Sequence, residues 1–138
     1  MNRPINDLTV LLRSMHPTLH PGVYVYAVLP LDADPSTLVP LGTFREAEGL
    51  TVIVPEEVAL GAGLTILFRS AWITLTVHSD LLAVGLTAGV ATALAQADIS
   101  CNVVAGAYHD HLFVPVETGP AALAALIALQ QRSQTSSK

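Results

Sequence analysis

Two histidines and a carboxylate occupy the consecutive positions His109, Asp110 and His111, the densest group of chemically active side chains in the sequence. Two imidazoles and a carboxylate can hold a metal ion or transfer a proton. A metal site needs a third and usually a fourth ligand, and no CxxC pattern supplies them. We favour the interpretation that Asp110 organises a turn while the histidines flank it, and we expect no metal and no cofactor.

The remaining reactive side chains have ordinary structural explanations that require no catalysis. Cys101 stands within an apolar segment, where a thiol is usually a small buried hydrophobic group. Ser79 is not surrounded by a GxSxG elbow, and His16 and His20, each followed by proline, are typical of loops. These observations argue against an enzyme.

A binding site is better supported, at the loop from Ser79 to Val84. This loop leads into a predicted helix whose first amides, near Val84, Gly85 and Leu86, are expected to be available to an anion such as a carboxylate. Asp80 and Asp110 are the nearest candidates to receive an ammonium group, although Asp80 also fits a solvated loop charge. The predicted ligand-binding residues are Ser79, Asp80, Val84, Gly85, Leu86 and Asp110.

The elements that position this loop follow from the hydrophobic pattern of the second half. Alternation predicts a strand over 72–78, and apolar residues at helical spacing predict a helix over 84–97. Strands are expected at 100–107 and 111–116, with a turn at 108–110, and Gly119 and Pro120 introduce a last helix. The order β-α-β-β-α lacks one strand of the ferredoxin-like arrangement, a four-stranded antiparallel sheet with both helices on one face.

The first half has a weaker pattern, with an amphipathic helix over 6–14 and a strand over 23–29. Further along we expect strands at 43–46, 50–54 and 65–69 and a helical turn at 55–60. This half lacks an opening strand and the second half lacks a closing one. We therefore hypothesise that the two units complete each other by sharing or adjoining strands.

Several phrases carry a family resemblance, namely VGLTA at 84–88, ISCNVVAG at 99–106, YHDHLFVP at 108–115 and, less specifically, TFREAEGLTVIVP at 43–55. The chain resembles a family of small bacterial proteins built from two ACT-like domains, and more distantly the CASTOR amino-acid sensors and the regulatory ends of aspartate kinases. The resemblance implies an α+β fold of two ferredoxin-like, βαββαβ-type units. We expect an N-terminal unit over 1–69, a C-terminal ACT-like domain over 70–132 and a disordered tail over 133–138.

In the resembling families the ligand lies where two ACT units meet, beside the strand-to-helix loop. The corresponding positions here are Ser79 to Leu86. The resemblance implies a regulatory module that binds an amino acid or similar small molecule and acts through a homodimer or a partner. A ligand-free interaction or assembly domain is the alternative, and a small enzyme ranks third.

The amino-acid composition limits the kinds of partner that the protein is expected to bind. The net charge of −5, from 11 acidic and 6 basic residues, disfavours nucleic acid, which needs clustered Lys and Arg. Of the 138 residues, 51% are hydrophobic, but they follow strand and helix periods. The uncharged stretch 81–97 holds glycines, threonines and a glutamine, so no membrane helix is expected. The single cysteine fits a reducing compartment, and the expected location is the cytoplasm.

Overall fold

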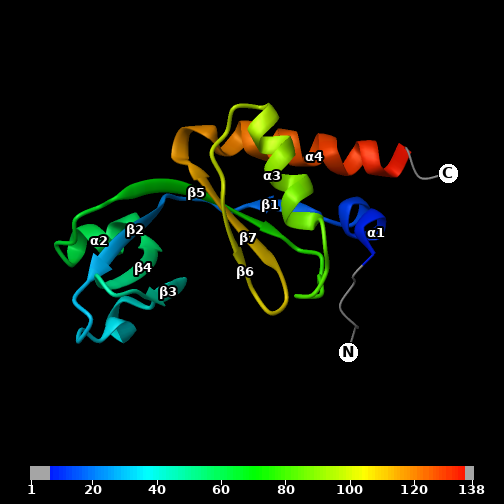
Figure 1. Ribbon diagram of the computed structural model, residues 1–138. Helices are drawn as coiled ribbons and strands as arrows, with labels where there is room; N and C mark the ends of the chain where they lie inside the picture. The colour runs from blue at the N-terminus through cyan, green and yellow to red at the C-terminus, as the bar shows by residue number, and fades with distance from the viewer. Residues whose placement is uncertain (1–6, 136–138) are drawn as a thin grey trace. The chain divides into compact units, whose positions relative to one another are not determined.

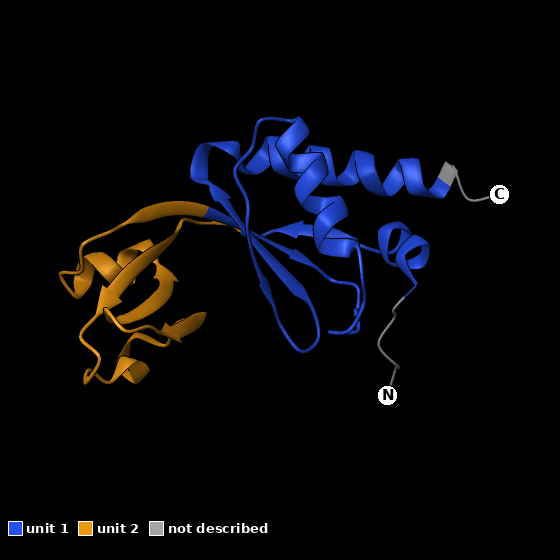
Figure 2. Cartoon of the chain, viewed as in Figure 1, with its two compact units in different colours: residues 1–20, 71–138 blue, residues 21–70 orange. Residues whose placement is uncertain are grey.

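The computed structural model describes residues 7–135 and divides the chain into two compact units. Unit 1 contains residues 1–20 and 71–138, and unit 2 contains residues 21–70 (Figure 2). The chain therefore enters unit 2 after His20 and leaves it after Ser70. This division differs from the expected one at residue 69, because the N-terminal segment folds with the second half of the sequence.

Unit 2 is a small antiparallel sheet in the order β3-β4-β2-β5. Its elements are β2 (Tyr24–Leu29), the 3-10 helix η1 (Pro35–Leu38), β3 (Gly42–Arg45), β4 (Leu50–Pro55), α2 (Glu56–Gly61) and the first three residues of β5 (Phe68–Leu75). Alternate residues of β2 and β4 point into one core with Ala59 of α2, and the buried set is Val25, Ala27, Leu29, Leu50, Val52, Val54 and Ala59. This alternation is the period of two that a sheet with one covered face requires.

Unit 1 has the order β1-β5-β7-β6 (Figure 1). Its elements are α1 (Leu8–Arg13), β1 (Pro17–Leu19), the rest of β5, α3 (Leu86–Gln96), β6 (Asn102–Ala105), β7 (Asp110–Pro115), η2 (Val116–Thr118) and α4 (Gly119–Thr135). β1 pairs antiparallel with β5 and so provides the strand that the second half lacks in its own sequence. The α+β fold with an antiparallel sheet and packed helices is confirmed, and α3 and α4 lie on the same side of the unit 1 sheet.

Several boundaries differ from those predicted. The strands expected at 65–69 and 72–78 form one strand, β5, because residues 68–70 pair with β2 while residues 73–75 pair with β1. α3 begins at Leu86 rather than Val84, since Gly85 has a left-handed backbone with φ 103°. Asp110 is the first residue of β7 and not a turn residue. The turn is closed one step earlier by the amide of Gly106, which donates to the carbonyl of His109 at 2.9 Å.

The expected disordered tail is wrong for residues 133–135. α4 continues to Thr135, and Ser133 is buried, with its hydroxyl donating to the carbonyl of Leu129 at 3.0 Å. This hydrogen bond to the preceding turn keeps a polar residue inside the helix. Positions 136–138 of the predicted tail, and Asn6 at the start of the first predicted helix, lie outside the described residues.

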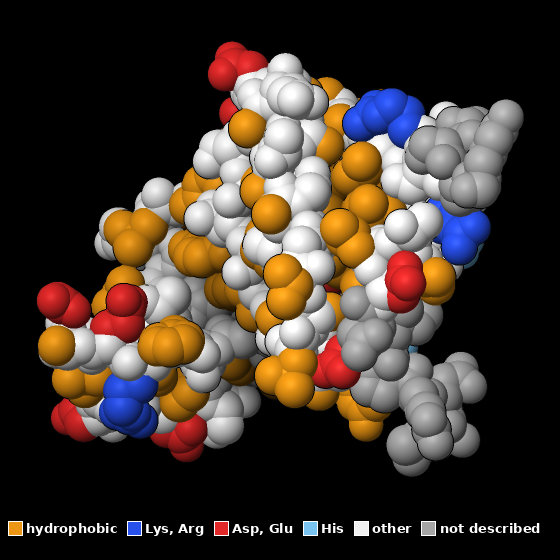
Figure 3. Space-filling view, turned by 45° about the vertical axis from the view of Figure 1, so that its right-hand side comes forward, with side chains coloured by type: hydrophobic (Ala, Val, Ile, Leu, Met, Phe, Trp, Pro, Cys, Tyr) orange, Lys and Arg blue, Asp and Glu red, His pale blue; other side chains and the backbone are white. Residues whose placement is uncertain are grey.

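Lys and Arg side chains are few on the surface and do not gather in one patch on the face that Figure 3 shows. Hydrophobic side chains, other uncharged side chains and the backbone fill most of that face. A phosphate backbone is bound by clustered positive charge, so this face does not resemble a nucleic-acid interface.

Candidate functional site

The loop between β5 and α3 is shaped by two local features. The carboxylate of Asp80 accepts a hydrogen bond from the amide of Leu82 at 2.9 Å, and its carbonyl accepts one from the amide of Ala83 at 2.9 Å. These bonds fold residues 80–83 into a turn of the type that aspartate favours. The Asp80 side chain is thus engaged by its own loop.

Gly85 ends the loop as the N-cap residue of α3, and its φ of 103° is a conformation that glycine adopts without strain. Glycine also leaves space, because a Cβ at this position would lie 3.0 Å from the Cδ2 atom of Leu8 in α1. A glycine has no side chain to cap a helix, and α3 has no side-chain cap hydrogen bond. The first amides of α3 therefore retain their capacity to bind an anion.

A buried hydrogen bond connects this loop with β7. The hydroxyl of Ser79 donates to the Oδ2 atom of Asp110 at 3.1 Å, and both residues are only 7% exposed. The two residues are 31 positions apart in sequence. A carboxylate has room for more hydrogen bonds than one hydroxyl supplies, so Asp110 keeps further acceptor capacity.

A pocket of about 60 Å³ adjoins this pair. It is lined by Ser79, Asp80, Leu81, Ala83, Leu86, Thr87, Ala105 and Asp110. The volume is that of about two water molecules and lies far below the usual range for drug-sized ligands. Beside the pocket is an apolar crevice, which shares Leu86, Thr87 and Asp110 with it and continues to Leu75, Val90, Val103 and Leu112.

The structure thus brings together four of the six predicted site residues, Ser79, Asp80, Leu86 and Asp110. Gly85 is not among the residues that line the pocket, and neither is Val84, which is 83% exposed. Thr87 and Ala105 were missed by the sequence analysis. Thr87 follows Leu86 in the first turn of α3, and a search beyond the helix start would have found it, whereas Ala105 has no signal in the sequence.

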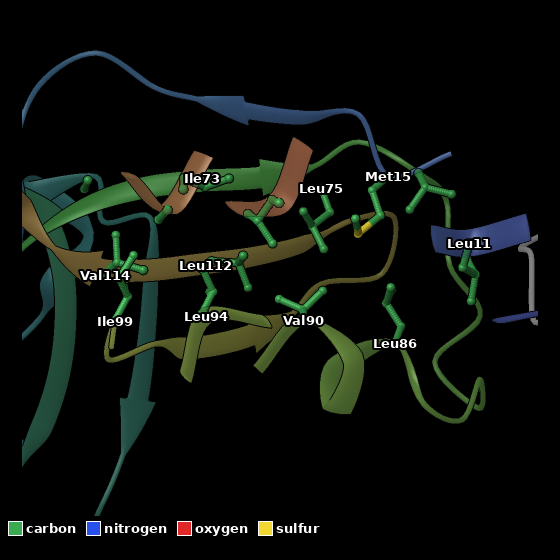
Figure 4. Close-up of a cluster of buried hydrophobic side chains, with 14 residues drawn as sticks. Leu11, Met15, Ile73, Leu75, Leu86, Val90, Leu94, Ile99, Leu112 and Val114 are labelled. Atoms are coloured by element: carbon green, nitrogen blue, oxygen red, sulfur yellow. The ribbon is translucent and has the colours of Figure 1, made fainter. Parts of the chain in front are cut away.

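The core of unit 1 positions the start of α3. Leu86 is 5% exposed and lies among the core side chains with Val90 and Leu94 of the same helix (Figure 4). These three residues have the i, i+4 spacing of one helix face, so their burial fixes the helix against the sheet. Because Leu86 also lines the pocket, the pocket wall is part of the core.

The electrostatic character of the pocket is two-sided. Its lining residues include the carboxylates of Asp80 and Asp110 and no Lys, Arg or His. Leu86 and Thr87, in the first turn of α3, contribute the positive end of the helix dipole. A molecule that carries both an ammonium and a carboxylate group fits this pattern.

Other chemistry has little support in the described residues. Burial raises the pKa of the Cys101 thiol to about 11, so it is protonated at neutral pH and a poor nucleophile. His109 and His111 have separate partners, since the Nδ1 atom of His109 lies 3.4 Å from the carbonyl of Val77 and that of His111 receives the indole of Trp72. Within residues 7–135, no three His, Cys, Asp or Glu side chains are grouped so that they could hold a metal ion.

Comparison with known proteins identifies the family. Residues 3–71 and residues 67–128 each match a model of the ACT domain. A crystal structure from Vibrio cholerae, of a protein of unknown function described as a possible transport protein, is 48% identical to this chain. It covers 89% of this chain and 95% of its own, with a TM-score of 0.80. The chain belongs to the ACT domain family. The resemblance inferred from the sequence is thereby confirmed.

More distant structures have the same fold. A protein from Agrobacterium tumefaciens is 18% identical, covers 83% of this chain and 87% of its own, and has a TM-score of 0.65. The ligand-free regulatory subunit of aspartate kinase from Thermus thermophilus is 12% identical, covers 84% and 97%, and has a TM-score of 0.64. The comparison with curated proteins gave no match. Among the described residues of this ACT-domain protein, no helix has the length and hydrophobicity to cross a membrane.

Proposed function

We propose that this ACT-domain protein is a regulatory module, not a catalyst, and that it binds a free amino acid at the loop between β5 and α3. The observation that carries the proposal is the buried Asp110 carboxylate beside the uncapped N-terminus of α3. Asp110 receives the ammonium group, while the amides at the start of α3 receive the carboxylate. The ligand-free aspartate kinase subunit, a regulatory protein of the same fold, supports this class of function.

The size of the pocket restricts the mode of binding. A space of about 60 Å³ accommodates the ammonium end of an amino acid but not the whole molecule. The loop over 80–84, in which Leu81, Leu82 and Val84 are exposed, therefore has to move when the ligand enters. Such a movement provides the signal, because it changes a surface that a second copy or a partner protein can contact.

The test is a thermal-shift screen of the full chain against the twenty amino acids, with the mass of each hit followed by light scattering. A ligand at a hundred times its Kd adds about 2.7 kcal/mol of stability. We expect the shift to disappear in Asp110→Asn, which keeps the size of the side chain and removes its charge. Asp98→Asn, at the exposed C-terminal end of α3, is the matched control and should keep the full shift.

A second function, a ligand-free interaction or assembly domain, is favoured by one observation. Leu81, Leu82 and Val84 of the same loop are 65%, 86% and 83% exposed. Contiguous exposed apolar side chains are typical of a binding surface. If no amino acid shifts the melting temperature and Leu82→Ser lowers the mass of an assembly of the chain, this second function replaces the first.

A further inference from the structure

The face of the unit 1 sheet opposite α3 and α4 carries a hydrogen-bonded network that is separate from the ligand pocket. The Nε1 atom of Trp72 donates to the Nδ1 atom of His111 at 3.2 Å, and the Oγ1 atom of Thr74 lies 3.1 Å from the same nitrogen. Thr74 Oγ1 also lies 2.7 Å from the Nε2 atom of His20. We call these four side chains the His111 network.

The positions of the protons follow from Trp72. An indole N–H can only donate, so the Nδ1 atom of His111 accepts and carries no proton. In this arrangement the Thr74 hydroxyl shares the same nitrogen as a second donor, and its oxygen accepts from His20 when that ring carries its proton on Nε2. All the bonds of the network are thus satisfied only when His111 is neutral.

The network holds the end of β1. His20 directly follows β1, its ring stacks on the indole of Trp72 with centroids 3.6 Å apart, and its amide donates to the carbonyl of Trp72 at 2.9 Å. β1 has only three residues, and β5 is its pairing partner. A strand this short depends on contacts beyond its ladder, and the side chain of His20 adds to those that Leu19 makes with the core.

We propose that the His111 network is a pH-sensitive contact, in which protonation of His111 breaks the bonds from Trp72 and Thr74 and releases the end of β1 from β5. A proton on Nδ1 would point at the indole N–H of Trp72, which cannot accept it, and the Thr74 hydroxyl would have to turn from donating to accepting. Thr74 is only 6% exposed, so water does not readily replace the lost bonds. The inference is independent of the proposed ligand site.

The surrounding charges agree with this direction. Burial lowers the pKa of His111, as do the neighbouring imidazoles of His109 and then His20, while Asp110 opposes them. On β5 the facing residues are Trp72 and Thr74, which carry no charge, and on β6 Val104 pairs with His111 in a strand without titratable side chains. Burial also lowers the pKa of His20.

The experiment uses two readouts in the full chain between pH 8 and pH 4.5. Trp72 is the only tryptophan in the sequence, so its emission reports the network, and hydrogen exchange of the His20 amide reports the end of β1. We expect both to change with one midpoint below 6.5, after correction for the intrinsic exchange rate. Each unit by which the pKa of His111 is lowered corresponds to a tenfold loss of protection.

Variants make the test decisive. Thr74→Val should reduce the protection of the His20 amide at neutral pH and move the midpoint of the Trp72 emission toward 6.5. His111→Gln, which offers Trp72 an oxygen acceptor but does not titrate in this range, should fold and lose the acid response. His16→Asn, whose parent side chain lies near Gln130 and not in the network, is the control and should behave as the wild type. The proposal is overturned if the His20 amide stays protected when the His111 ring is protonated, or if His111→Gln keeps the acid response.

Discussion

Each unit contains a hairpin, and the second strand of that hairpin has a similar pattern in both units but a different role in each. β4 of unit 2, LTVIVP, and β7 of unit 1, DHLFVP, have the same alternation of buried and partly buried residues, and both follow a four-residue turn. Their first residues, Leu50 and Asp110, are 5% and 7% exposed. Leu50 packs in an apolar core, whereas Asp110 accepts from Ser79 at the wall of a pocket.

The helices that precede the two hairpins also differ, in their length and in the way their N-termini are capped. In unit 2 it is the four-residue η1, and its N-cap residue Asp34 accepts a hydrogen bond from the amide of Ser36 at 2.9 Å. In unit 1 it is the eleven-residue α3, whose N-cap is Gly85 without a side-chain bond. Unit 2 satisfies the start of η1 and its core internally, while unit 1 leaves a carboxylate and the N-terminus of α3 beside a pocket. The comparison supports the placement of the proposed ligand site in unit 1.

The largest effect is expected when the unit 1 residue is placed in unit 2. Leu50→Asp puts a carboxylate into the apolar core of unit 2, at the position paired with Leu29 of β2, and should lower the free energy of unfolding by about 4 kcal/mol or more. Denaturant titration followed by circular dichroism measures this. Leu50→Met, which conserves volume, should cost less than about 1.5 kcal/mol. A mild effect of Leu50→Asp would mean that the start of β4 is open to water.

The reciprocal exchange should spare folding and remove binding. Asp110→Leu combined with Ser79→Ala replaces both partners of a buried bond by apolar groups, so the free energy of unfolding should change by less than about 1 kcal/mol. The ligand-dependent gain of about 2.7 kcal/mol should vanish. Calorimetric titration with any amino acid found in the screen is the measurement. Retained affinity in this double variant would remove Asp110 from the site.

Gly85→Ala tests the glycine cap that distinguishes α3. A left-handed backbone costs a residue with a Cβ about 1–2 kcal/mol, and the added atom would also press on Leu8. Gly42→Ala, at a position with no atom within 4 Å, is the control and should be close to neutral. Thermal unfolding of the two variants under one condition compares them. Equal stability would show that the backbone at Gly85 relaxes.

The smallest effect concerns pH and should arise in unit 1. The pKa values of His20 and His111 are lowered in the folded protein, so the unfolded state binds more protons below their ordinary value of 6.5. Stability should therefore be complete above pH 6.5 and decline as the pH falls through the lowered pKa values. Unfolding curves from pH 8 to pH 4.5 measure the decline, and His111→Gln should reduce it to the part that His20 contributes. A curve that is unchanged by this variant would assign the decline to other groups.

Part of the site could be predicted because it depends on local sequence. Gly85 before an apolar helical stripe indicated the start of α3, and the turn residues after β5 indicated the loop. Asp110 is predicted in a turn because aspartate is a frequent turn residue, and a charged side chain is rarely buried. When β4 and β7 are aligned on the Val-Pro dipeptide at their ends, Asp110 takes the position of Leu50. This equivalence predicts that Asp110 is buried, as Leu50 is.

The amino-acid sequence by itself determined the α+β class, the alternation of each strand, most of the helices and the ACT family, because these depend on periodicity and on phrases a few residues long. Only the tertiary structure decided that residues 17–19 complete the sheet of the second half, that β5 is one strand through both units, and that His20 meets Trp72 and Thr74. The physical reason is that these are pairings between positions more than forty residues apart. A hydrophobic pattern specifies which face of a strand is buried but not which strand lies beside it.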